Sequence, residues 1–275
     1  MTLRQLVLSQ SRDKNWNFYR KLRDLYAHGY IELKRGSDEN FKYQVWQLTK
    51  KGFEYIVESL HVVLKENGFA SENVFHDYLV TAFHVGEWMF VQPPQVELFS
   101  EQELRRNWPS NYPNWVPEIQ VHRPDGYTLL KDGKNKKLIA IEVEISAKNF
   151  EIYQEVASFY DDMENITSVL WLVRSKSLME KIQKAVYSRR GKRPGIHNFV
   201  LLEDFKKQFW NAKIIEGSEK GYSIHEYYCN IHCNIDYQIS AILGNSDAFL
   251  TFLKPVKSPY GMKAYVDSVN ARKAD

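Results

Sequence analysis

The fold is decided by the stretch PEIQVHRPDGYTLLKDGKNKKLIAIEVEISAK, residues 117–148. Its second half places an aliphatic residue at every second position, as a strand with one buried face does. These residues are Ile139, Ile141, Val143 and Ile145. The segment DGKN, residues 132–135, separates the two halves and has the composition of a hairpin turn. The stretch therefore predicts an antiparallel hairpin with strands over 117–131 and 136–148.

Three carboxylates fall on one face of this predicted hairpin. If Lys131 pairs with Lys136 around the turn, Asp125 lies opposite Glu142, and Glu144 lies one pleat further along. Like charges this close destabilise a fold, and a divalent cation would remove that cost. An acidic patch exposed on an ordinary surface hairpin is the alternative that the sequence leaves open.

The segment around this hairpin alternates between helix and strand. Helices are expected over 72–90 and directly after the hairpin, with a basic helix over 177–190. Buried strands are expected at VLWLV, residues 169–173, and at the start of 199–205. Residues 91–116 read as loop with a short helical piece at 100–106. Alternation of this kind predicts an α/β fold with a mixed sheet flanked by helices.

The first 66 residues have a different pattern. A helix is expected over 15–28, ended by Gly29, and strands over 30–35 and 41–48 precede a helix that Thr49 caps. Helix, hairpin and helix in this order resemble the later part of a winged-helix domain. The basic residues on the helix and hairpin are then candidates for DNA contact: Arg20, Lys21, Arg23, Lys34, Arg35 and Lys42. A packing unit that touches no DNA is the alternative.

The Pro-Asp-Gly of residues 124–126 and the triplet Glu142-Val143-Glu144 resemble the PD-(D/E)XK nuclease superfamily. There a PD at a strand bend is followed by D/E-x-K on the neighbouring strand and then by a helix. Here Glu144 occupies the position of the expected lysine, and Lys148, four residues later, would supply the basic group instead. Together with the winged-helix-like segment, residues 15–205 are similar to the replication-relaxation family of bacterial mobile elements.

The resemblance implies a restriction-endonuclease-like domain over 67–275, with a C-terminal extension, after the winged-helix-like segment 1–66. It implies Mg²⁺ or Mn²⁺ held by Asp125 and Glu142, with a main-chain carbonyl near Val143. Glu144 or Lys148 would orient or deprotonate the attacking water. The catalytic candidates are thus Asp125, Glu142, Glu144 and Lys148. Asp77, Glu87 and Glu103 are further candidate ligands that no spacing rule separates.

The distribution of charge along the chain agrees with a polyanionic partner. Residues 1–60 hold 11 Lys and Arg against 7 Asp and Glu, and residues 61–170 hold 9 against 17. Residues 171–275 hold 17 against 10. Basic flanks suit DNA, and an acidic middle suits a divalent cation. A compact basic loop adds four candidate phosphate contacts, Arg189, Arg190, Lys192 and Arg193.

Several classes of protein are disfavoured by the sequence. No P-loop, GxGxxG or GxSxG motif is present, and no apolar run is long enough to span a membrane. Cys229 and Cys233 are the only cysteines, which favours a reducing cytoplasm. With His225 and His232 they fit no common zinc spacing, so partly buried side chains are the simpler interpretation.

Two functions remain. The first is a Mg²⁺-dependent DNA endonuclease that hydrolyses or nicks phosphodiesters in a mobile-element, plasmid or phage context. The second is a catalytically degenerate nuclease fold that binds DNA or positions a partner nuclease, relaxase or transposase. The three-carboxylate face favours the enzyme, and the missing lysine favours the binding protein. Protein partners would come from recombination, replication or conjugation.

Overall fold

A computed structural model describes residues 15–38, 41–60, 73–89, 92–118, 121–132, 135–188 and 193–230. The chain divides into two compact units. Of the described residues, the first unit comprises 15–38, 41–60 and 73–78, and the second comprises those from 79 to 230. The predicted boundary at 66/67 lies among residues 61–72, outside the described part. No helix in the described ranges has the length and apolar character needed to cross a bilayer.

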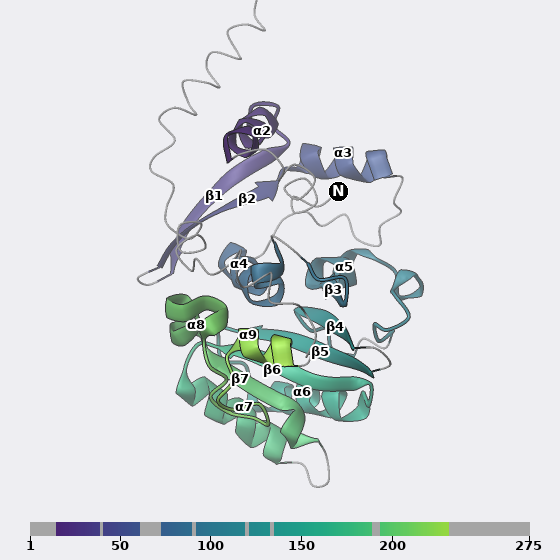
Figure 1. The fold of residues 1–275 in the computed structure, drawn as a ribbon, viewed down its shortest axis with the longest axis vertical. Helices are drawn as coiled ribbons and strands as arrows, with labels where there is room; N and C mark the ends of the chain where they lie inside the picture. The colour runs from purple at the N-terminus through teal and green to yellow at the C-terminus, as the bar shows by residue number, and fades with distance from the viewer. Residues whose placement is uncertain are drawn as a thin grey trace, which may run out of the picture. The chain divides into compact units, whose positions relative to one another are not determined.

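The first unit contains a helix, a hairpin and a second helix, as the sequence predicts (Figure 1). Helix α2 (Asn15–Ala27) precedes the antiparallel strands β1 (Ile31–Asp38) and β2 (Phe41–Leu48), which α3 (Lys50–Leu60) follows. The predicted signals at the helix ends are confirmed. Gly29 has a φ of 72°, which suits glycine after a helix, and Thr49 Oγ1 accepts a hydrogen bond from the Gly52 N–H at 3.1 Å.

The second unit is built on a five-stranded mixed sheet in the order β3-β4-β5-β6-β7. Strands β3 (Val96–Ser100), β4 (Gly126–Asp132) and β5 (Asn135–Glu144) are antiparallel neighbours. Strands β6 (Ile166–Val173) and β7 (His197–Leu201) continue the sheet in parallel with β5. Helix α6 (Phe150–Asp162) connects β5 to β6, and α7 (Lys176–Tyr187) lies between β6 and β7 in the chain. The predicted α/β class and mixed sheet are confirmed.

The register of the predicted hairpin is also confirmed, because Lys131 pairs with Lys136 and Gly126 pairs with Ile141. Consequently Leu138 and Ala140 share a face with the buried residues of α6 and α7, whereas Ile139, Ile141 and Val143 lie on the other face. Figure 1 shows α6 and α7 on one face of the sheet, with α9 (Ile224–Asn230) on the other. By the alternation of the strand, Glu142 and Glu144 belong to the face covered by α6.

Three sequence predictions need correction. The predicted loop 91–116 contains strand β3, which leads directly into α5 (Glu101–Arg106). The strand predicted to begin at 117 begins only at Gly126, and the described residues before it are not extended in the sheet. The predicted helix over 72–90 is α4 (Val74–Val80) followed by a π-helical turn (Thr81–Val85) and a 3-10 turn (Gly86–Met89).

Candidate functional site

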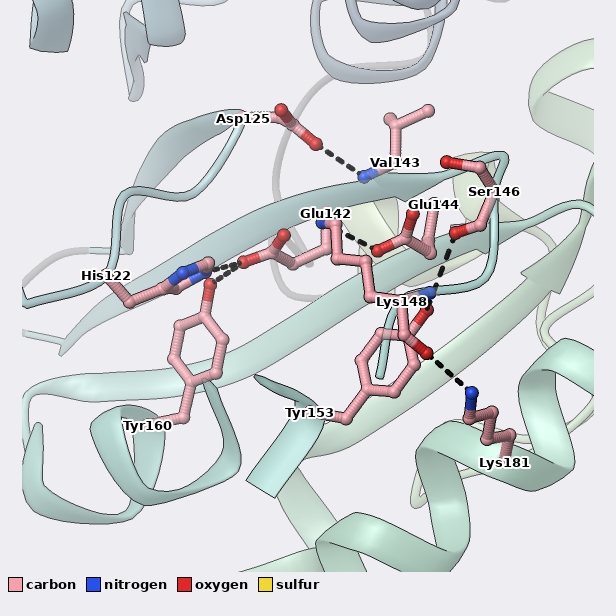
Figure 2. A network of polar contacts seen from close by, with 10 residues as sticks. All are labelled: His122, Asp125, Glu142, Val143, Glu144, Ser146, Lys148, Tyr153, Tyr160 and Lys181. Carbon is pink, nitrogen blue, oxygen red and sulfur yellow. Dashed lines mark hydrogen bonds and ion pairs between the residues drawn. The ribbon is translucent and has the colours of Figure 1, made fainter. Parts of the chain in front are cut away.

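Two carboxylates are buried at the end of β5. The exposed fractions of Glu142 and Glu144 are 6% and 4%. The alternative interpretation of these residues as a solvent-exposed acidic patch is therefore wrong. Burying an ionised carboxylate is costly unless hydrogen bonds or an opposite charge compensate it. Each of the two should thus have polar partners, and each does (Figure 2).

Glu142 is held by two donors on one oxygen. Its Oε1 lies 2.6 Å from His122 Nε2 and also accepts a hydrogen bond from the Tyr160 hydroxyl. His122 comes from the segment before β4, and Tyr160 comes from α6. Burial, and then the negative charge of Glu142, raise the pKa of the Tyr160 hydroxyl well above its usual value, so the phenol remains a donor.

Glu144 is paired with Lys148. Lys148 Nζ lies 2.7 Å from Glu144 Oε2, and Figure 2 shows the lysine side chain extending from the loop before α6 toward Glu144 and Glu142. Burial raises the pKa of Glu144, although the hydrogen bond from Lys148 opposes that shift. Burial lowers the pKa of Lys148, but Glu144, aided by the charges of Glu142 and Asp125, raises it overall.

Asp125 lies just before β4 and makes two hydrogen bonds to the backbone of β5. Its backbone N–H donates to the Ile141 carbonyl at 2.9 Å, and its Oδ2 accepts from the Val143 N–H at 2.6 Å. Asp125 is half-buried. The structure therefore brings the four predicted catalytic residues, Asp125, Glu142, Glu144 and Lys148, to one end of β5 (Figure 2).

Gly126 of the Pro-Asp-Gly segment is required by packing on the opposite face. A Cβ atom at this position would lie 2.4 Å from Cε1 and Nδ1 of the buried His84 ring. His84 Nε2 in turn lies 3.1 Å from the Tyr127 carbonyl oxygen. The glycine thus lets the helical turn Thr81–Val85 approach β4 directly behind the carboxylates.

His122, Tyr160 and Tyr153 were not among the predicted site residues. Tyr153 lies in α6; its hydroxyl accepts a hydrogen bond from the Lys148 backbone N–H at 2.9 Å, and its ring centre lies 5.8 Å from Lys181 Nζ. A signal existed for the tyrosines, because both lie on the apolar side of the helix that follows the hairpin, and a buried phenol needs a hydrogen-bond partner. For His122 the only signal was its place three residues before Asp125.

The donor chemistry of this end of β5 fits a hard divalent cation. Mg²⁺ is commonly bound through one or two carboxylates together with waters and substrate phosphates. Asp125 and Glu142 would supply two such oxygens. Within the described ranges, the ligand atoms of Asp125, Glu142 and Glu144 do not all lie within 4.8 Å of one another, so a cation would take two of the three carboxylates or move them.

The other predicted ligands and basic residues are placed as follows. Asp77 lies in α4, Glu87 lies in the 3-10 turn Gly86–Met89, and Glu103 completes a capping box with Ser100 at the start of α5. In the first unit Arg20 and Arg35 are exposed, Lys21, Arg23 and Lys34 are half-buried, and Lys34 pairs with Glu32 at 3.2 Å. Lys42 lies in β2, opposite Ser37. His225 and Cys229 lie in α9. Outside the described residues are Arg189, Arg190, Lys192, His232 and Cys233.

Arg193 has a structural role that the sequence did not suggest. Its guanidinium donates to the main-chain carbonyl oxygens of Tyr160, Met163 and Ile166. Its backbone N–H donates to Asp161 Oδ1 at 2.9 Å. The side chain therefore holds the connection between α6 and β6, and contact with phosphate stays a prediction.

Comparison of the chain with protein-family models, with curated proteins and with solved structures finds no match.

Proposed function

We propose that the chain is a DNA-binding protein whose second unit hydrolyses or nicks DNA phosphodiesters with Mg²⁺ or Mn²⁺, as a PD-(D/E)XK nuclease does. The observation that carries the proposal is the pair of buried carboxylates, Glu142 and Glu144, beside Asp125 at the end of β5. Burial of two like charges side by side costs stability, so a site that uses them is the simplest reason for their presence.

The arrangement of elements supports the same proposal. Asp125 precedes β4, the triplet ending in Glu144 lies at the end of the neighbouring strand β5, and helix α6 follows. This is the order in which the nuclease superfamily presents its motif. In the first unit, the helix, hairpin and helix support a winged-helix-like DNA-binding segment.

The residues of the site divide the expected roles. Asp125 and Glu142 would hold the cation, which when bound supplies an activated water and offsets charge on the phosphate. Burial raises the pKa of the Glu144 carboxyl, which suits a group that accepts a proton from water. Lys148 remains protonated beside it and is suited to contact the phosphate anion.

One observation favours the second candidate function, a degenerate nuclease fold that binds DNA or positions a partner enzyme. Each carboxylate already has an internal partner: the Val143 N–H for Asp125, His122 and Tyr160 for Glu142, and Lys148 for Glu144. Carboxylates compensated by such partners would be stable without a cation, and the site need not perform catalysis.

Nicking of supercoiled plasmid DNA by the full chain, with and without Mg²⁺ or Mn²⁺, separates the two candidates. We expect metal-dependent nicking by the wild type, its loss in Asp125→Asn, and its retention in Glu203→Gln. Glu203 is the matched control, because it is an exposed carboxylate paired with Lys207 on α8 (Leu202–Gln208).

Melting curves of the same proteins complete the test, because a cation that binds only the native state raises the melting temperature by mass action. Metal stabilisation with nicking supports the nuclease. Metal stabilisation without nicking supports the binding protein, and the absence of both responses contradicts a metal site here.

A further inference from the structure

The hydrogen bonds on Glu142 are concentrated on one of its two oxygens. Both His122 Nε2, at 2.6 Å, and the Tyr160 hydroxyl contact Oε1. The donors come from separate parts of the chain, one from the segment before β4 and one from α6. Oε1 is therefore fixed from two directions.

The two donors are themselves held by packing. Tyr160 has no exposed surface, and its ring packs edge-to-face against His122 at 5.7 Å and against Phe159 at 5.1 Å. His122 also contacts the Phe159 ring at 5.5 Å. The three rings pack against one another and keep the two donor atoms in place. A rotation of the Glu142 carboxylate would therefore break both hydrogen bonds to Oε1.

The second oxygen of Glu142 takes part in neither bond. Figure 2 shows it pointing away from His122 and Tyr160. A carboxylate held by one oxygen presents the other in a fixed direction, which lowers the entropy lost when a ligand binds. Residues that hydrogen-bond a metal ligand in this manner commonly set its affinity for the metal.

We propose that His122 and Tyr160 are positioning residues that clamp Glu142 Oε1 so that Oε2 is presented to the divalent cation. The inference rests on the proposed metal site and extends it by naming the residues that prepare it. It also explains why the buried Glu142 has Tyr160 and the half-buried His122 as partners at the end of β5, since a carboxylate needed only for packing could be replaced by an apolar side chain.

Calorimetric titration of the full chain with Mn²⁺ tests the clamp directly. Tyr160→Phe removes only the hydroxyl, and His122→Leu removes the ring donor. We expect each to weaken Mn²⁺ binding by about 10- to 100-fold, the usual effect of losing a residue that orients a metal ligand. His122→Gln offers an N–H donor in nearly the same place and should restore most of the affinity.

Tyr112→Phe is the matched control. Tyr112 is a buried tyrosine of the same unit whose hydroxyl donates to the Leu104 main-chain carbonyl at 2.6 Å and not to a carboxylate. This variant loses a comparable hydrogen bond and should keep the wild-type affinity. Melting curves recorded without metal establish that each titrated variant is folded, and Tyr160→Phe with His122→Gln suffice if His122→Leu does not fold.

Three results are distinguishable. The clamp is supported if Mn²⁺ binds more weakly to Tyr160→Phe and to His122→Leu. In that case His122→Gln should bind Mn²⁺ nearly as tightly as the wild type, and Tyr112→Phe should show no change. Equal affinities in the wild type, Tyr160→Phe and the folded His122 variants overturn the clamp and leave the metal site standing. A wild type that binds no Mn²⁺ overturns the metal site itself and the clamp with it.

Discussion

At the scale of single residues, both buried carboxylates of the second unit have specific hydrogen-bond or ion-pair partners. Glu142 and Glu144 have His122, Tyr160 and Lys148 as partners. His197, at the start of β7, is 1% exposed, and its Nδ1 accepts a hydrogen bond from the Trp171 indole at 3.0 Å. The hydrophobic pattern predicts which positions are buried, but it cannot predict these partners, because they come from segments distant in sequence.

His197 leads to a prediction about pH. Burial, and then the positive charge of Arg193, lower its pKa from 6.5 to about 3. The unfolded chain therefore binds a proton below pH 6.5 that the folded chain does not, and stability present above pH 6.5 is lost as the pH falls toward 3. The expected slope from this residue is about 1.4 kcal/mol per pH unit.

Urea unfolding of the wild type and His197→Asn between pH 7 and 4.5 measures this contribution. Asparagine keeps an acceptor for the Trp171 indole but does not titrate. The free energy of unfolding should fall more steeply with acid in the wild type than in the variant. Parallel pH profiles would show that His197 titrates normally in the folded protein.

At the scale of elements, the β4-β5 hairpin was predictable down to its register, whereas its beginning and its neighbour were not. Alternation over 136–145 and the Asp-Gly turn are local signals, and they were sufficient. Pro124 has no N–H for a ladder hydrogen bond, which explains why the predicted strand does not extend back from Gly126. Strand β3 has only five residues, and pairing with β4 defines it.

The contact between β4 and the turn Thr81–Val85 gives a second prediction. Gly126→Ala would place a methyl group against the His84 ring, which is 1% exposed and cannot move into solvent. We expect a loss of about 1–3 kcal/mol in the free energy of unfolding, as overpacking in a core costs. Chemical denaturation measures it.

Gly195→Ala is the matched control for this substitution, since a Cβ atom there would meet nothing within 4 Å. Its stability should be close to that of the wild type. An equally small effect at both positions would mean that His84 can withdraw from β4 and that the glycine is not required by packing.

At the scale of the whole molecule, the chain has a small unit made of a helix, a β-hairpin and a second helix, and an α/β unit with buried carboxylates. The sequence predicted the helix, hairpin and helix of the first unit, the mixed sheet of the second unit, and the three carboxylates on the β4-β5 hairpin. It could not predict that Glu142 and Glu144 are buried, because an alternating strand predicts one buried face, whereas residues 138–144 of β5 are buried on both faces. Basic residues flanking the acidic middle suggest that the first unit contributes affinity for DNA.

That contribution is measurable as the salt dependence of binding. Arg20 and Arg35 are exposed in the first unit. Replacing both with Ala should weaken binding to duplex DNA and lower the slope of log affinity against log salt by about 1 for each lost phosphate contact. Lys207→Ala, an exposed lysine of the second unit paired with Glu203, is the control. An unchanged slope in the double variant would return the first unit to a packing role.

The central claim is that Asp125 and Glu142 together hold a divalent cation. The most direct measurement is anomalous diffraction from crystals of the full chain grown with Mn²⁺, in the wild type and in Asp125→Asn. We expect an anomalous peak bound by an Asp125 carboxylate oxygen and Glu142 Oε2, with Oε1 still held by His122 and Tyr160, and no such peak in the variant. A wild-type crystal at saturating Mn²⁺ with no peak between these two carboxylates, or with a peak only elsewhere, would contradict it.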